Sequence, residues 1–440
     1  MNLDQHFIAY LNTQAATIQT LVKKKTNNGI AGDLIESLSE RIPVADFGPE
    51  DIIKGEIFSV EHSDKGELIQ KWLITSPDEK IGFDKAGYEE YKKLLNAIYK
   101  RKEINELVAY RFLEVELFKW FLFKREEGST TFSDDLIELI KSNISEMVYC
   151  FPVAMVQISN SFEIGPVQIR YFTEEDFDRL SESTPGDITA VREHFQGKVV
   201  VCTTVSAQKD RASEIALEKC SLAIDLLKIS SNTLYMPDLD LVFDIDSRAK
   251  NHEVTTIISH GLNFESFNFT DSATRFIALT DEYFFEMNGR GLDILSRFVF
   301  EDSTESELCG LIINAITNFA SALSNPDLHQ RIASSCSIFE SLLLNNENVG
   351  ILSSLQKYCP KLVTPDPEIR NSIMELLKRV YEIRSVLVHH GKRKHIDLTE
   401  LSNFQQLLFS LILNLMHKTE SHQTKASLLN EIDEAINRAY

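Results

Sequence analysis

Arg384 and His389 stand near the end of an apolar-periodic segment, with four residues between them and Gly391 two residues further on. A histidine side chain titrates near a pKa of about 6.5, so it can remove or return a proton close to neutral pH. An arginine guanidinium stays charged and binds a phosphate through two nitrogen donors. Together, these residue types suit acid–base chemistry on a phosphodiester.

The charge around this pair is opposite in sign to that of the whole chain. From Lys378 to His395 there are six Lys/Arg and one Glu, while the chain carries 45 Lys/Arg against 66 Asp/Glu, a formal charge of −21. Such an acidic surface repels nucleic acid, so a general coating role is excluded. RNA binding would be confined to the basic cluster, with Lys392, Arg393, Lys394, His390 and His395 as its candidate contacts. A solvated basic turn is the alternative interpretation.

The segment 380–391 resembles the R-x4-6-H signature of HEPN ribonuclease domains, and most of all the ApeA-like branch. There a Y-x-x-R-S-x-x-V-H-x-G pattern closes a long helix, and the matching residues here are Tyr381, Arg384, Ser385, Val388, His389 and Gly391. The stretch 331–344, RIASSCSIFESLLL, resembles the preceding helix of that branch, with Glu340 before a leucine run. The likeness covers about the last third of the chain.

This resemblance implies a metal-independent RNA endonuclease without a cofactor. It also implies a homodimer in which two such motifs meet across a two-fold axis to form a composite site. In the family, this activity acts in abortive defence against phage, often by cleaving the cell's own tRNA or other RNA. The region before the helical domain would then sense or regulate, for instance in response to a phage-derived trigger.

In such a site His389 would take the proton from the RNA 2′-OH and protonate the leaving 5′-oxygen, while Arg384 would stabilise the charge on the phosphate. Residues five apart on an α-helix are separated by about 140° around the axis, so the long arginine would have to curl toward the histidine. Tyr381 and Ser385 are candidate hydrogen-bond donors to the same phosphate. Their alternatives are a packed aromatic ring and a helix-bound hydroxyl.

The length and composition of the chain limit its domain number, the state of its cysteines and its location. A chain of 440 residues with 43% hydrophobic and 25% charged residues is globular and predicts two or three domains. Its six cysteines form no CxxC pair, which predicts free thiols in a reducing compartment and no structural zinc. The N-terminal sequence shows no signal peptide, and the apolar stretch 407–416 is too short to span a bilayer. We therefore expect a cytoplasmic protein.

Hydrophobic periodicity predicts an α+β fold: an irregular N-terminal α/β region with a largely antiparallel sheet, then an all-helical bundle. The expected domains are 1–149, 150–301 and 302–440. In the first we expect helices at 3–25, 30–42, 88–100 and 106–123, a helix capped by Ser133 and running to Met147, and strands at 52–61 and 69–75. In the second we expect a hairpin of 151–158 and 162–171 with a possible bulge at Gly165, strands at 198–205, 239–245, 253–259 and 263–269, and a helix at 209–228. In the third we expect helices at 305–323, 328–345, 350–358, 368–389, 398–418 and 425–437, punctuated by Asn325-Pro326, Pro360 and Pro365-Asp366-Pro367.

Other signals compete with this interpretation. Asp238, Asp240, Asp244 and Asp246 share one parity of a predicted strand and could hold Mg²⁺ for a metal-dependent nuclease, but a solvated sheet face is the favoured interpretation. Three further segments are interpreted as loop or surface: the loops Asp78-Glu79-Lys80 and Gly289-Arg290-Gly291, and the surface pair His417 and His422. Glu340 is a possible partner of Arg384, although a helix-surface glutamate is the simpler expectation. A non-catalytic module that binds RNA or protein remains the alternative function.

Overall fold

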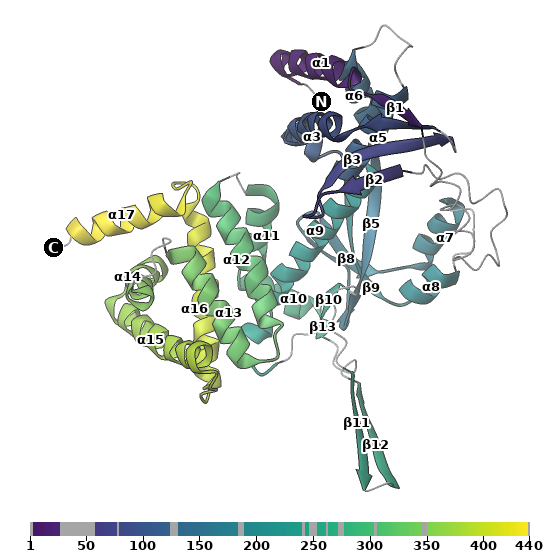
Figure 1. Ribbon diagram of the computed structural model, residues 1–440. Coiled ribbons are helices and arrows are strands. Elements are labelled where there is room, and N and C mark those ends of the chain that lie inside the picture. Colours follow the sequence, from purple (N-terminus) through teal and green to yellow (C-terminus); the bar gives the residue numbers. More distant parts are fainter. Residues whose placement is uncertain are drawn as a thin grey trace. The chain divides into compact units, whose positions relative to one another are not determined.

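A computed structural model describes residues 3–26, 58–76, 79–123, 131–183, 189–239, 243–245, 253–260, 263–271, 277–302, 306–344 and 350–438 (Figure 1). Its internal contacts divide the chain into two compact units. Unit 1 comprises residues 1–147 and 205–215, and unit 2 comprises residues 148–204 and 216–440. The helix predicted at 30–42 and the first half of the strand predicted at 52–61 lie outside the described residues.

Unit 1 combines helices with an antiparallel sheet in the order β1-β4-β3-β2. Its strands are β1 (Lys23–Thr26), β2 (Phe58–His62), β3 (Leu68–Ser76) and β4 (Glu79–Phe83), and its helices are α1 (Gln5–Gln19), α3 (Lys85–Tyr99), α4 (Lys102–Asn105), α5 (Tyr110–Phe123) and α6 (Phe132–Ser142). Two predictions are wrong here. The first helix ends at Gln19 and gives way to β1, and Glu79 and Lys80 belong to β4 rather than to a loop.

Thr131, not Ser133, caps α6. The Thr131 side chain accepts a hydrogen bond from the Asp134 amide, as an N-cap residue does. Ser133 is buried, and its amide donates to the side chain of Asn12 on α1. The helix predicted to reach Met147 ends instead at Ser142, because the apolar and aromatic run that follows favours a strand, β5 (Ser145–Ala154).

Unit 2 contains a five-stranded sheet in the order β10-β5-β9-β8-β7. The pairings β10–β5, β9–β8 and β8–β7 are antiparallel, which agrees with the predicted α+β class. The further elements of this region are β7 (Phe162–Ile164), β8 (Val167–Tyr171), α7 (Glu174–Ser183), α8 (Thr189–Phe195), β9 (Val199–Ala207), α9 (Lys209–Ile229), the short 3-10 helix η1 (Asn232–Leu234) and β10 (Asp244–Ile245).

The hairpin predicted from 151–158 and 162–171 is wrong in its pairing. β5 pairs with β10, β6 (Val156–Ile158) pairs in parallel with β13 (Ile277–Leu279), and the observed hairpin is β7–β8. Gly165 lies in the turn of that hairpin with φ +55°, and a Cβ there would lie 2.4 Å from the ring of Phe300. Only glycine fits both the left-handed backbone and this close approach.

A separate antiparallel ribbon is formed by β11 (Glu253–His260) and β12 (Asn263–Asp271), close to the strands predicted there. The helices α10 (Asp281–Gly289) and α11 (Leu292–Arg297) and the π-helical turn η3 (Phe298–Asp302) follow β13. Gly291 has φ +111° and begins α11, so the expected loop at Gly289-Arg290-Gly291 is a tight link between helices.

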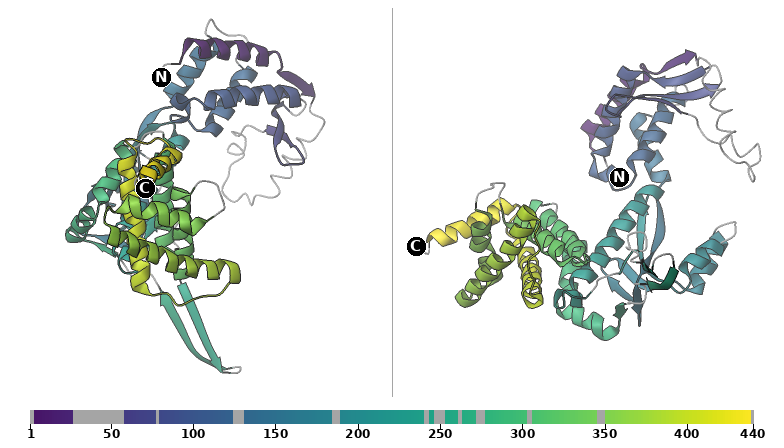
Figure 2. Two further views of the ribbon diagram at one scale, coloured as in Figure 1. Left: turned by 90° about the vertical axis from the view of Figure 1, so that its left-hand side faces the viewer. Right: turned by 60° about the horizontal axis from the view of Figure 1, so that its bottom comes forward.

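The C-terminal helices confirm the predicted pattern, and Figure 2 shows them gathered in one bundle. They are α12 (Glu307–Leu323), α13 (Leu328–Leu343), α14 (Ile351–Val363), α15 (Pro367–His390), α16 (Leu398–Lys418) and α17 (Lys425–Arg438). Pro360, expected to end a helix, lies instead inside α14. It is buried beside Leu355 and Cys359, so packing outweighs the loss of one backbone hydrogen bond near the end of the helix.

One hydrophobic core connects the sheet of unit 2 with these helices. It runs from Val153 and Val201 on the sheet, through α9, to Phe339 on α13 and to Phe404 and Ile412 on α16. The predicted middle and C-terminal regions therefore share a core and fall in one compact unit.

Unit 1 has its own core, in which the rings of Phe83, Tyr91, Phe118 and Phe121 pack against one another. Among the helices of the described ranges, none combines the length and apolarity needed to cross a membrane.

Candidate active site at the end of α15

Local sequence signals define both ends of α15. Asp366 caps its N-terminus by accepting hydrogen bonds from the amides of Glu368 and Ile369, and Pro367 occupies the first helical position. At the other end Gly391 adopts φ +62° and its amide donates to the Leu387 carbonyl. The predicted motif therefore occupies the last turns of the helix, as expected.

Arg384 faces the neighbouring helix α13. Its Nη2 lies 3.5 Å from Oε1 of Glu340, and about one fifth of each side chain is exposed to solvent. The simpler expectation for Glu340, a glutamate on the open helix surface, is thus wrong, because Glu340 lies on the side of α13 that packs against α15. Arg384 Nε is buried and has no hydrogen-bond acceptor among the described residues.

Tyr381 packs between the same two helices. Its ring is buried, and its hydroxyl donates a 3.0 Å hydrogen bond to the carbonyl of Cys336 on α13. Burial, together with the Cys336 thiol and the Glu340 carboxylate, raises the pKa of Tyr381 far above its ordinary value. The hydroxyl therefore stays protonated and is held by α13, which matches the packed alternative for Tyr381 rather than contact with a phosphate.

His389 and Ser385 lie on the open side of α15. Both are exposed, as is His390, and neither His389 nor Ser385 has a hydrogen-bond or ion-pair partner in the parts of the chain that the structure describes. Val388 beside them is also exposed, to 54%. Because Arg384 faces α13 and His389 faces solvent, a single chain groups Arg384 with Glu340 and Tyr381 and leaves His389 apart from them.

The basic cluster after α15 is held against acidic side chains. Arg393 Nη2 lies 2.6 Å from Asp327, and Lys394 Nζ lies 2.6 Å from Glu382. The Lys394 carbonyl lies 2.8 Å from Nε2 of His329 on α13. The ammonium of Lys394 lowers the pKa of Glu382. Ion pairs between side chains as exposed as Arg393 and Glu382 contribute little to stability.

Lys392 and His395 differ from these two residues. Both are exposed and have no ion-pair partner within the described ranges. Sequence reasoning did not identify Asp327, His329 or Glu382 as neighbours of the cluster. Asp327 follows Asn325-Pro326 and has the N-cap position of α13, which the sequence does signal. Its contact with Arg393, 66 residues away, has no local signal.

Of the four competing aspartates, Asp238 and Asp244 lie in the described part of the chain. Asp244 is 2.7 Å from the buried ammonium of Lys228, Asp238 is exposed, and Asp240 and Asp246 lie outside the described residues. In the described part of the chain, no three His, Cys, Asp or Glu side chains are arranged to hold a metal ion.

The two histidines expected at the surface differ from each other. His417 is exposed as expected. His422 is buried and its Nε2 lies 2.7 Å from Glu431, so its predicted surface position is wrong.

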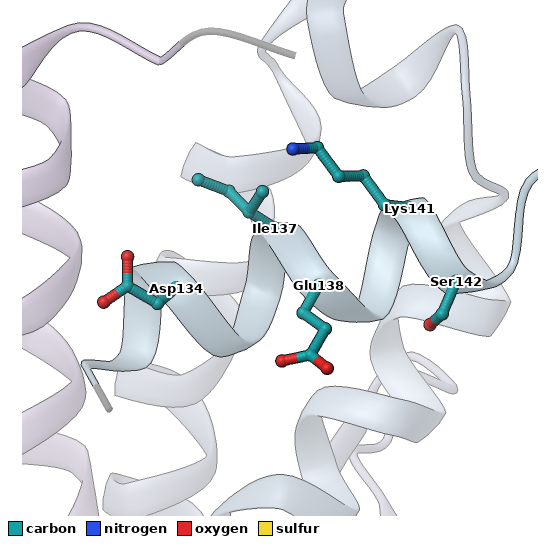
Figure 3. Close-up of a pocket in the computed structure, with 5 residues that line it drawn as sticks. All are labelled: Asp134, Ile137, Glu138, Lys141 and Ser142. Atoms are coloured by element: carbon teal, nitrogen blue, oxygen red, sulfur yellow. The ribbon is translucent and has the colours of Figure 1, made fainter. Parts of the chain in front are cut away.

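A hollow of about 480 Å³ lies along α6, lined by Asp134, Ile137, Glu138, Lys141 and Ser142 (Figure 3). All five residues come from one helix, and the charged ones carry both signs. Among the described residues the lining comes from α6 alone, which gives the hollow the character of a helix face rather than of a built binding site.

The chain was compared with protein-family models, with curated proteins and with solved structures, and nothing in the three collections matches it.

Proposed function

We propose that this protein is a metal-independent RNA endonuclease of the HEPN type that acts as a homodimer. The supporting observation is the end of α15, where an exposed histidine, an arginine oriented by a carboxylate, and a basic cluster follow one another within twelve residues, from Arg384 to His395. The motif that carries the family resemblance thus lies at an accessible helix end in a helical bundle.

In the proposed reaction the imidazole of His389 takes the proton from the 2′-OH of the RNA. The 2′-oxygen attacks the adjacent phosphorus, and the bond from phosphorus to the 5′-oxygen breaks. The products are a 2′,3′-cyclic phosphate and a 5′-hydroxyl, whose proton a histidine supplies. Arg384 stabilises the charge on the non-bridging oxygens, and removing a single donor of this kind costs a few kcal/mol.

A second copy of the chain completes this site. Because Arg384 and His389 leave α15 in different directions, the histidine of one protomer would act with the arginine of the other. A mixture of Arg384→Ala and His389→Ala chains tests this arrangement. Shared sites predict that mixing restores activity, since each mixed dimer retains one site with both wild-type residues. Sites within one protomer predict no restoration.

Purified protein incubated with total tRNA in the presence of EDTA tests the activity itself. We expect cleavage by the parent chain and a loss of about 10²–10⁴-fold for His389→Ala, the range for removal of a general acid–base. His417→Ala is the matched control, because His417 is an exposed histidine in the last turn of α16. Equal cleavage by the parent and His389→Ala would reject the proposal. Cleavage that requires Mg²⁺ would favour the aspartates of the middle region.

The biological role proposed with this activity is abortive anti-phage defence in the cytoplasm, with tRNA or another cellular RNA as substrate and a phage-derived trigger sensed by the N-terminal region. The chain would then inhibit growth when overexpressed. Arg384→Ala and His389→Ala chains should lose this toxicity at equal protein levels, and a variant as toxic as the parent would contradict the role.

A non-catalytic module that binds RNA or protein is the second candidate. The contacts of Arg384 with Glu340, and of Tyr381 with Cys336, would then serve helix packing alone. This alternative predicts that RNA is bound without being cleaved and that His389→Ala binds RNA as the parent does.

A further inference from the structure

Two cysteines meet across neighbouring strands of the five-stranded sheet. Cys150 lies on β5 and Cys202 on β9, which are adjacent in the sheet, and their Sγ atoms are 2.7 Å apart. Carbon atoms in van der Waals contact lie about 3.5–4.0 Å apart, and sulfur is larger than carbon, so the two sulfurs are closer than in an ordinary contact. A disulfide bond is about 2.05 Å long, so an approach of roughly 0.7 Å would bring these sulfurs to bonding distance.

The two thiols differ in their surroundings. Cys202 is buried, with 4% of its surface exposed, whereas Cys150 is only partly buried. The Cys202 thiol donates a hydrogen bond to the Cys150 sulfur. This bond lowers the pKa of Cys150 and outweighs the effect of burial. The guanidinium of Arg170 lowers that pKa further, and the carboxylate of Asp176 opposes it without reversing the direction. The same bond, together with burial, raises the pKa of Cys202.

Arg170 is fixed beside the pair. It lies on β8, next to β9 in the sheet, and holds Asp176 through two hydrogen bonds, 2.5 and 2.9 Å long. A guanidinium near a partly exposed thiol favours the thiolate, which is the reactive form of cysteine. The geometry thus assigns Cys150 as the thiol that reacts first and Cys202 as the thiol that resolves the product.

Three other cysteines lack this combination of partial exposure, a neighbouring thiol at short distance and a nearby guanidinium. Burial raises the pKa of Cys220 to about 12, and it raises the pKa of Cys336 and Cys359 further. Cys220 is near the pair, but its sulfur lies 3.8 Å from the Val201 carbonyl, within reach of a weak hydrogen bond. Burial thus disfavours the thiolate form of these three cysteines, although the sequence gives no reason to separate them from Cys150 and Cys202.

We propose that Cys150 and Cys202 form a dithiol site that hydrogen peroxide converts to an intramolecular disulfide. The Cys150 thiolate attacks one peroxide oxygen, the O–O bond breaks, and the sulfur becomes a sulfenic acid while the other oxygen leaves and takes a proton to form water. Cys202 then attacks that sulfur and loses its proton, and a second water leaves. The two thiols lose two electrons and two protons in total, and peroxide accepts both. This site is independent of the proposed nuclease activity.

The full-length protein tests the proposal without any substitution. Free thiols are alkylated after peroxide treatment, and peptides are mapped by mass spectrometry with and without a reductant. The expected product is a peptide pair joined through Cys150 and Cys202 that is lighter by two hydrogen atoms and separates on reduction. Alkylation of both cysteines after peroxide, or a bond from Cys150 to Cys220, would overturn the proposal.

Substitutions assign the two roles. In Cys202→Ser the sulfenic acid on Cys150 has no resolving thiol, so a dimedone adduct should accumulate there. In Cys359→Ala, the matched control, the joined peptides should form as in the parent, because Cys359 is buried on α14. A dimedone adduct on Cys202 of a Cys150→Ser chain, at the level seen on Cys150, would refute the assigned order. If a variant fails to fold, the peptide map of the parent still decides the proposal.

Discussion

At the scale of single residues, Tyr381, Arg384 and Glu340 form a small polar group in the apolar packing between α13 and α15. The residue types on α15 were readable from the sequence because they lie within one motif. Their partners were not, since Glu340 and Cys336 stand more than forty residues earlier and only packing of the two helices brings them near. A motif therefore predicts which side chains could take part in a reaction, while the fold determines which of them are in contact.

Tyr381→Phe separates packing from chemistry. The change removes the hydrogen bond to the Cys336 carbonyl, so we expect the free energy of unfolding to fall by about 1 kcal/mol in urea titrations. RNA cleavage per folded molecule should stay near that of the parent. A stable Tyr381→Phe chain with cleavage reduced a hundredfold would instead give the hydroxyl a direct role in the reaction.

The pKa of Asp176 predicts how the stability of the fold changes at low pH. Burial alone would raise the pKa of Asp176, but hydrogen bonds from Arg170 and Thr173 lower it below the ordinary value of 3.8. Because the folded pKa is lower, the unfolded chain binds more protons in acid. The stabilisation is therefore full above about pH 4–5 and is lost as pH falls through the folded pKa.

The substitution Asp176→Asn tests this predicted dependence of stability on pH. We expect the substitution to cost about 2 kcal/mol of unfolding free energy at neutral pH. The difference from the parent should shrink toward the lowest pH at which both chains remain folded. A difference that stays constant or grows in acid would show that the Arg170–Asp176 pair contributes no proton linkage.

At the scale of elements, the C-terminal helices were the most predictable part. Their 3.6-residue periodicity, the Asp366-Pro367 start and the Gly391 stop are all local signals, and α16 has the predicted bounds of 398 and 418. The strands were harder to predict because pairing is not local. β6 pairs with β13, about 120 residues later, and β5 pairs with β10, so the segment 151–158 could not reveal its own partners.

Substitutions at two glycines test whether the left-handed backbone at Gly391 ends α15. Gly391 has φ +62° with open space around its Cα, so Gly391→Ala adds backbone strain without a clash. We expect a loss of about 1 kcal/mol in unfolding free energy. Gly310 inside α12 also faces open space but has an ordinary helical φ, so Gly310→Ala should stabilise by about 0.5–1 kcal/mol. Effects of the same sign at both positions, measured by urea titration, would contradict the left-handed end of α15.

At the scale of the whole molecule, the charge of −21 opposes any contact with RNA, and the basic cluster has to act against it. Two of its cations are shared with Asp327 and Glu382. Affinity under the proposed function should therefore be modest and sensitive to salt.

Replacing Lys392, Arg393 and Lys394 together with Ala tests the cluster. Three phosphate contacts to single-stranded RNA predict a slope of about −2 for log affinity against log salt concentration. The triple variant should bind more weakly, with a slope near zero. Filter binding across a salt series, using His389→Ala chains to prevent cleavage, measures both slopes. Identical slopes would place the RNA elsewhere on the protein.

The division of the chain into units has a consequence for biosynthesis. Residues 205–215 complete unit 1, yet they are translated only after residues 148–204, which belong to unit 2. On the ribosome the first 147 residues therefore emerge before the segment in which Gln208 bonds to the backbone of Leu107 and Ala109. The buried residues of the N-terminal core in the described ranges run from Leu3 to Ile140, so this core does not depend on the late segment. A nascent chain stalled in between would lack the contacts of the strand end and helix start that are supplied more than fifty codons later.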